Sequence, residues 1–144
     1  MQPSELKRPK RLWVVSIMNI AVATISIVAL VFMITSDRVP AEVQPTAVGA
    51  AVSGFLGILL IASSLLALLK YLKARWLALG AALIFYGTLL LQSALLVAGA
   101  ELPDGTSTKL WSSIVRSTIE ISLNIWVFLG SKIALYRRAA ESAT

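Results

Sequence analysis

Long apolar segments separated by short polar ones dominate this sequence. Residues 12–36 carry no charged side chain over 25 positions, and residues 43–69 and 76–100 are also uncharged. At about 1.5 Å rise per residue, each segment exceeds the roughly 30 Å hydrocarbon core of a bilayer. The pattern predicts transmembrane helices over about 12–36, 45–69 and 76–100, with Pro45 at the first turn of the second, where proline is tolerated.

A fourth apolar segment, 110–136, is interrupted by Arg116, Glu120 and Lys132. Lys132 can extend its side chain to the nearer interface, whereas Arg116 and Glu120 lie within the span. We expect a fourth transmembrane helix over about 110–136. The predicted fold class is therefore all-α, a polytopic four-helix membrane bundle that forms a single transmembrane domain over residues 1–144.

A cleavable signal peptide is the alternative for the N-terminal segment, since basic residues precede it and Val39-Pro40-Ala41 loosely resembles a cleavage site. The apolar segment 12–36 is, however, longer than the typical 7 to 15 residues of a signal peptide core, which favours a retained helix.

Basic residues are distributed unevenly between the two sides of the bundle. Four precede the first helix, three lie in 70–75 and three in 132–138, whereas the alternate side has only Arg38 and Lys109. The positive-inside rule predicts that both termini are cytoplasmic and that 37–44 and 101–108 are exoplasmic loops. The expected location is a membrane crossed several times, the inner or plasma membrane if the chain is bacterial.

The composition supports the membrane interpretation and narrows the chemistry. Hydrophobic residues make up 58% of the chain and charged ones 14%, against about a quarter charged in soluble domains. The basic residues that give the net charge of +6 lie mainly beside the ends of the apolar segments. We therefore expect the lipid bilayer and not nucleic acid as the partner. With no Cys or His, and no HExxH, GxSxG or P-loop motif, we expect no catalytic residues, metal or cofactor, and no enzyme.

Small residues mark one face of each middle helix, where backbones can approach closely. On the second helix this face comprises Gly49, Ser53, Gly54 and Gly57; on the third, Gly80 and Gly87 stand at heptad spacing. We interpret both faces as packing surfaces within the bundle, with homodimerisation as the alternative for the second helix.

Polar side chains within the spans need internal partners, because hydrocarbon supplies none. Ser16, Asn19 and Ser26 share one face of the first helix, and Gln92 lies on the third. Asn19 is in the cytoplasmic half and Gln92 towards the exoplasmic end, so we do not expect them to meet. Both are predicted to form interhelical hydrogen bonds.

The fourth helix carries the strongest signal, a polar stripe within an arc of about 100°. The stripe comprises Ser113, Arg116, Ser117, Glu120, Asn124 and Ser131. Arg116 and Glu120 are four residues apart, so their side chains can meet. Ionisable residues within a membrane are costly and so predict a functional site. Two interpretations of the stripe are open. In the first, the stripe faces the bundle or a partner protein and its charges neutralise each other. In the second, it lines a water-filled path on which Glu120 binds a proton or cation.

Two functions remain open from the sequence. The first is a non-enzymatic accessory, assembly or regulatory subunit, which docks to a larger membrane protein through the polar stripe or the small-residue face of the second helix. The alternative is a small ion- or proton-coupled transporter that uses Arg116 and Glu120, either as a single chain or as a homo-oligomer. Two features count against the transporter: the predicted spans contain a single carboxylate, and the sequence lacks a clear inverted repeat.

Overall fold

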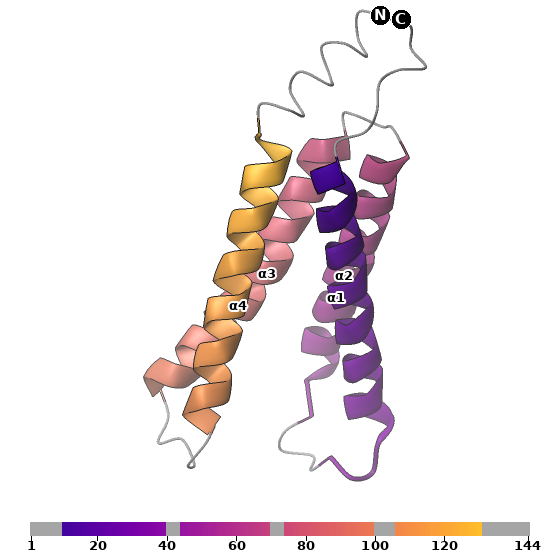
Figure 1. Cartoon of the computed structure of the whole chain (residues 1–144). Helices are drawn as coiled ribbons and strands as arrows, with labels where there is room; N and C mark the ends of the chain where they lie inside the picture. Colours follow the sequence, from indigo (N-terminus) through magenta and orange to yellow (C-terminus); the bar gives the residue numbers. More distant parts are fainter. Residues whose placement is uncertain (1–9, 40–43, 70–73, 100–105, 131–144) are drawn as a thin grey trace, which may run out of the picture.

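The computed structural model describes residues 10–39, 44–69, 74–99 and 106–130. Over these ranges the chain forms four α-helices: α1 (Lys10–Thr35), α2 (Ala47–Leu68), α3 (Ala74–Gly99) and α4 (Thr106–Phe128) (Figure 1). The predicted all-α class is confirmed. By length and composition, α1, α2 and α3 are apolar enough to cross a membrane, as expected of a membrane protein; α4 is not among the helices that meet this criterion.

The helices extend beyond the apolar segments at several ends. The first helix begins at Lys10, and α4 begins at Thr106, before the first apolar residue of its span. Helical hydrogen bonding depends on the backbone, so it continues through polar residues at the end of an apolar segment. The second helix begins at Ala47, so Pro45 precedes it and does not lie in its first turn as predicted. The Thr46 hydroxyl caps this start by accepting a hydrogen bond from the Gly49 amide at 3.1 Å. Beyond Phe128, residues 131–136 of the predicted fourth span lie outside the described part.

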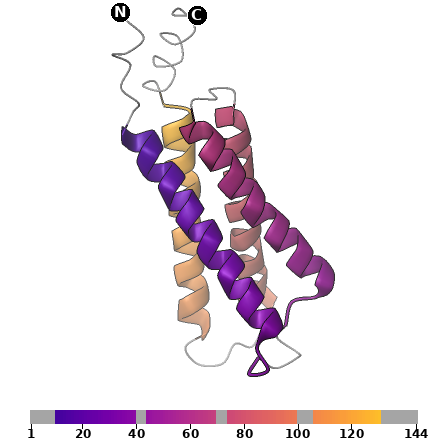
Figure 2. The ribbon, with the colours of Figure 1, turned by 90° about the vertical axis from the view of Figure 1, so that its right-hand side faces the viewer.

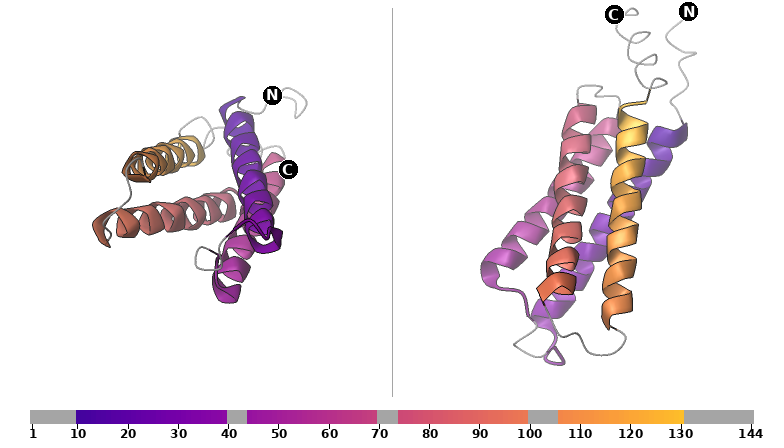
Figure 3. Two further views of the ribbon diagram at one scale, coloured as in Figure 1. Left: turned by 90° about the horizontal axis from the view of Figure 1, so that it is seen from below. Right: turned by 90° about the vertical axis from the view of Figure 1, so that its left-hand side faces the viewer.

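Successive helices are antiparallel neighbours, and α1 also contacts α4, though less extensively than successive helices contact each other (Figure 2). At one end, which we call the packed end, lie Lys10, Leu68, Ala74 and Phe128. Towards the opposite end, which we call the splayed end, the α1–α2 pair separates from the α3–α4 pair (Figures 1 and 3). The bundle is therefore asymmetric along its axis.

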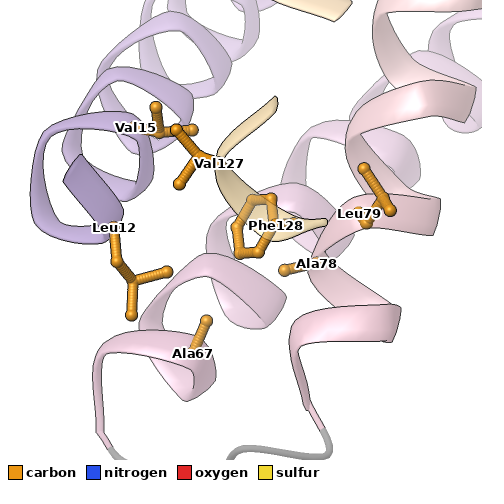
Figure 4. Close-up of a cluster of buried hydrophobic side chains, with 7 residues drawn as sticks. All are labelled: Leu12, Val15, Ala67, Ala78, Leu79, Val127 and Phe128. Atoms are coloured by element: carbon orange, nitrogen blue, oxygen red, sulfur yellow. The ribbon is translucent and has the colours of Figure 1, made fainter. Parts of the chain in front are cut away.

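A cluster of buried apolar side chains joins all four helices at the packed end (Figure 4). The cluster comprises Leu12, Val15, Ala67, Ala78, Leu79, Val127 and Phe128. Phe128, the last residue of α4, is 1% exposed, which ties the end of α4 to the rest of the bundle. Close packing of this kind excludes water and closes the bundle at this end.

The small-residue faces take different places in the structure. A Cβ atom added at Gly57 would lie 3.0 Å from Ile27 Cγ1, so α1 and α2 approach closely there. At Gly54 the same atom would meet Leu30 at an ordinary 3.7 Å, and Gly49 belongs to the start of α2. Added at Gly80 or Gly87, it would meet nothing within 4 Å. The heptad glycines of α3 therefore do not form the close helix contact that their spacing suggests, because α3 presents them to open space.

Candidate functional site in the interior of the bundle

Three polar side chains from three helices meet in a buried hydrogen-bonded network. Asn19 of α1 and Asn124 of α4 exchange amide hydrogen bonds of 2.8 and 3.2 Å, and the Tyr86 hydroxyl of α3 donates to Asn19 Oδ1 at 3.0 Å. Asn124 also donates to the backbone carbonyl of Glu120 at 2.8 Å. All three side chains are completely buried. The network thus links α1, α3 and α4 on the side of the packed end.

Tyr86 is the member of this network that the sequence reasoning missed. A usable signal existed, since a phenol in the middle of an apolar span needs a hydrogen-bond partner when it is buried. Its ring also packs edge-on against Phe85, with ring centroids 5.2 Å apart. Asn19 and Gln92 do not meet, because Gln92 lies farther towards the splayed end, where it is exposed and lines a separate, half-open cavity.

One helical turn beyond Asn124, towards the splayed end, Arg116 and Glu120 form an ion pair within α4. Arg116 Nε donates to Glu120 Oε1 at 3.0 Å. The two side chains differ sharply in exposure, at 62% for Arg116 and 9% for Glu120. The carboxylate therefore lies inside the bundle, whereas much of the guanidinium-bearing side chain reaches out of it.

The remaining stripe residues also turn towards the interior. The Ser93 hydroxyl of α3 donates to the Ser113 hydroxyl of α4 at 3.1 Å, and Ser117 is buried. Ser131 lies outside the described residues. The structure thus brings Ser113, Ser117, Glu120 and Asn124 to the inner face of α4. The helical period predicts that these residues share a face, but not whether that face points inwards or outwards.

A half-open cavity of about 320 Å³ lies between α1, α3 and α4, with exposed residues such as Ile25, Lys109 and Arg116 in its wall, and we call it the α1–α4 cavity. Its polar wall belongs to α4 and includes Lys109, Ser112, Ser113, Arg116, Ser117 and Glu120, whereas α1 contributes Ile25, Ser26 and Ala29 and α3 contributes Leu89. Arg116 and Glu120 also line an apolar groove along the outside of α4, beside Met18 of α1. The ion pair therefore stands where the cavity meets the lateral surface of the bundle.

A second cavity, of about 260 Å³, lies between α1, α2 and α3. Gln92, Thr88 and Ser53 contribute polar atoms to a wall that is otherwise mainly apolar. Ser26, Ala29 and Leu89 line both cavities and so form the partition between them. Both cavities lie towards the splayed end, and exposed residues in their walls, among them Ala29, Ser53 and Gln92, show that they open to the surface of the bundle.

Buried serines add polar groups between the network and the packed end. Ser16 of α1 and Ser63 and Ser64 of α2 are completely buried. Ser63 donates to the Leu60 carbonyl at 3.2 Å, while the Ser16 and Ser64 hydroxyls have no hydrogen-bond partner among the described residues. Uncharged hydroxyls of this kind are tolerated in helices more readily than charged groups.

The chemistry available to this interior is that of one carboxylate, two cations, hydroxyls and amides. Within the described ranges, no three acidic side chains come together in a group that could hold a metal ion, and the chain has neither His nor Cys. An ionised carboxylate accepts hydrogen bonds, whereas guanidinium and ammonium groups only donate them. No protein-family model, curated protein or solved structure matches the chain.

Proposed function

We propose that this chain is a small four-span membrane protein in which ions or protons reach Glu120 through the interior of the bundle. The single observation that carries the proposal is the direction of the polar stripe: Ser113, Ser117 and Glu120 line the α1–α4 cavity, and the side chain of Glu120 is only 9% exposed. Of the two functions that the sequence leaves open, the inward direction of Ser113, Ser117 and Glu120 favours ion- or proton-coupled transport, because docking through these residues would require them to face outwards.

The proposal includes α4 as the fourth membrane span. Its 23 residues give a length of about 34 Å, enough to cross the hydrocarbon core. Its exposed side chains include Trp111, Val115, Ile119 and Trp126, as expected of a surface in contact with lipid. The exposed hydroxyls of Thr118 and Ser122 donate at 2.8 Å to carbonyls of their own helix and so need no water.

The uneven distribution of basic residues supports cytoplasmic termini, with the packed end on the cytoplasmic side. In this orientation the α1–α4 cavity lies towards the exoplasmic side. The amide network and the apolar cluster then separate Glu120 from the cytoplasm. This arrangement corresponds to a transporter with its site accessible from one side, and the asymmetry between the two ends of the bundle supports it.

Proton flux into proteoliposomes tests this proposal. Purified protein is reconstituted with a pH-sensitive dye in the lumen, and the lumen pH is followed after an acid step outside. We expect Glu120→Gln to remove the protein-dependent flux while the bundle still folds, since the variant keeps the shape of the side chain. The matched control is Asp37→Asn, which removes an acidic charge from an exposed position beyond the end of α1. Equal flux in wild type and Glu120→Gln would refute the proposal.

An accessory subunit is the second candidate, and the 62% exposure of the Arg116 side chain favours it. A charged side chain that is exposed within a membrane calls for a covering group, which a segment of a larger membrane protein can supply. Purification in mild detergent separates the two functions. A stoichiometric larger partner supports the accessory subunit, whereas flux from the purified chain alone supports transport.

A further inference from the structure

The charges that face the α1–α4 cavity do not balance. Among the described residues that line it, Lys109 and Arg116 are cationic and Glu120 is anionic, whereas α1 and α3 contribute only uncharged side chains to the wall. Tyr86 of α3 is a further titratable group that interacts electrostatically with Glu120 and Arg116, and its hydroxyl is engaged with Asn19. The cavity therefore carries a net positive charge, which disfavours a cation and favours an anion.

Arg116 has more hydrogen-bonding capacity than its contact with Glu120 uses. A guanidinium offers five N–H donors, and the hydrogen bond to Glu120 is made by Nε. The hydroxyls of Ser112 and Ser117 line the same wall, one helical turn or less from Arg116. Guanidinium and hydroxyl donors together are the groups that replace the hydration shell of an anion.

We propose that the α1–α4 cavity binds a small monovalent anion on Arg116, together with a proton on Glu120. This inference rests on the proposed function and names the solute that accompanies the proton. When Glu120 is ionised, it neutralises Arg116 across the 3.0 Å contact. When Glu120 takes up a proton from the exoplasmic side, its charge is lost and an anion takes its place beside the guanidinium.

This exchange keeps the charge of the cavity constant. Lys109, Arg116 and ionised Glu120 sum to one positive charge, and so do Lys109, Arg116, protonated Glu120 and a monovalent anion. A constant charge matters because an unbalanced charge away from water is costly. The proton and the anion consequently favour each other's binding to the same extent, and they cross together without net charge movement. A divalent anion would bring this sum to zero and so would not keep the charge constant, which favours monovalent solutes.

The size and position of the cavity agree with a small solute. A volume of about 320 Å³ holds a small anion with some water, but not a transmembrane helix, whose diameter with side chains is about 10–12 Å. Lys109, in the first turn of α4, stands near the mouth of the cavity, where it attracts anions before they reach Arg116.

Anion-driven acidification is the test. Proteoliposomes of phosphatidylcholine alone, with a pH-sensitive dye inside and equal pH on both sides, receive an inward gradient of chloride, nitrate or formate. We expect the lumen to acidify with these anions and not with gluconate, which is too bulky for the site. The rate should be unchanged when valinomycin and potassium hold the voltage at zero. Asp37→Asn, outside the cavity, should behave as wild type.

Chloride binding in detergent is measured on the same variants through the rise in melting temperature. The wild type should bind chloride more tightly at lower pH, whereas Glu120→Gln should bind it without pH dependence. Arg116→Gln should raise the half-saturating chloride concentration at least tenfold, and Arg116→Lys should restore part of the binding. These shifts keep the inference testable even where a variant is inactive in vesicles.

Each contrary outcome has a distinct meaning. Proton flux that requires Glu120 but is indifferent to the anion overturns this inference and leaves the proposed function standing. Flux that is unchanged in Glu120→Gln overturns both. If added phosphatidylglycerol stabilises the protein through Arg116 and chloride does not, the site holds a lipid phosphate and the dissolved anion is the wrong ligand.

Discussion

The buried amide pair offers the sharpest test of the packing described here. Asn124→Leu removes both hydrogen bonds between Asn124 and Asn19 and leaves the Asn19 side-chain nitrogen, which is completely buried, without its partner. Interhelical hydrogen bonds in membranes contribute about 0.6 kcal/mol each on average. Stranding a buried polar group costs about 1–3 kcal/mol. We expect Asn124→Leu to lower the free energy of unfolding by about 2–3 kcal/mol.

The double variant Asn19→Leu with Asn124→Leu should lose less than the sum of the two single variants. Replacing both partners with apolar groups strands neither amide, although the Tyr86 hydroxyl then loses its acceptor. Adding Tyr86→Phe removes that last stranded group. We therefore expect a coupling energy of about 1–2 kcal/mol between positions 19 and 124, within the range seen for residues in contact.

The assay is equilibrium unfolding in mixed micelles with increasing sodium dodecyl sulfate, monitored by tryptophan fluorescence. It is carried out on the wild type, the two single variants and the double variant. Thr24→Val is a matched control, because its hydroxyl is exposed and donates within its own helix to the Ile20 carbonyl at 2.7 Å. If the losses in unfolding free energy of the two single variants simply add, with a coupling energy below about 0.3 kcal/mol, the conclusion that the amides face each other is refuted.

Two further predictions follow from particular positions. Gly57→Leu should lower the free energy of unfolding by about 1–3 kcal/mol, because its side chain must displace α1, whereas Gly80→Leu should stay within about 0.5 kcal/mol; thermal unfolding in detergent that ranks them equally would contradict the close contact. Since the native chain has no cysteine, single cysteines at Ser107 and Ala74 report the topology. An impermeant thiol reagent should label Ser107→Cys in intact cells but not Ala74→Cys, and the reverse pattern would overturn cytoplasmic termini.

The sequence alone determined the helical class and the approximate positions of the helices. Uncharged segments of about 25 residues have few alternatives, since hydrocarbon requires every backbone group to be satisfied within the helix. The spacing of Arg116 and Glu120 likewise placed both on one helix face, because positions four apart are neighbours on any α-helix. These properties depend on the chain within one or two turns of each residue.

Only the tertiary structure decided where the stripe faces and which polar groups meet. Asn19 and Asn124 are separated by more than 100 positions, and no sequence pattern around either residue indicates that the other is its partner. The role of Tyr86 and the difference between Gly57 and Gly80 have the same origin, because both depend on how each helix is rotated against its neighbours. The period of a helix fixes which residues share a face, but the rotation of that face is set by packing across all four helices.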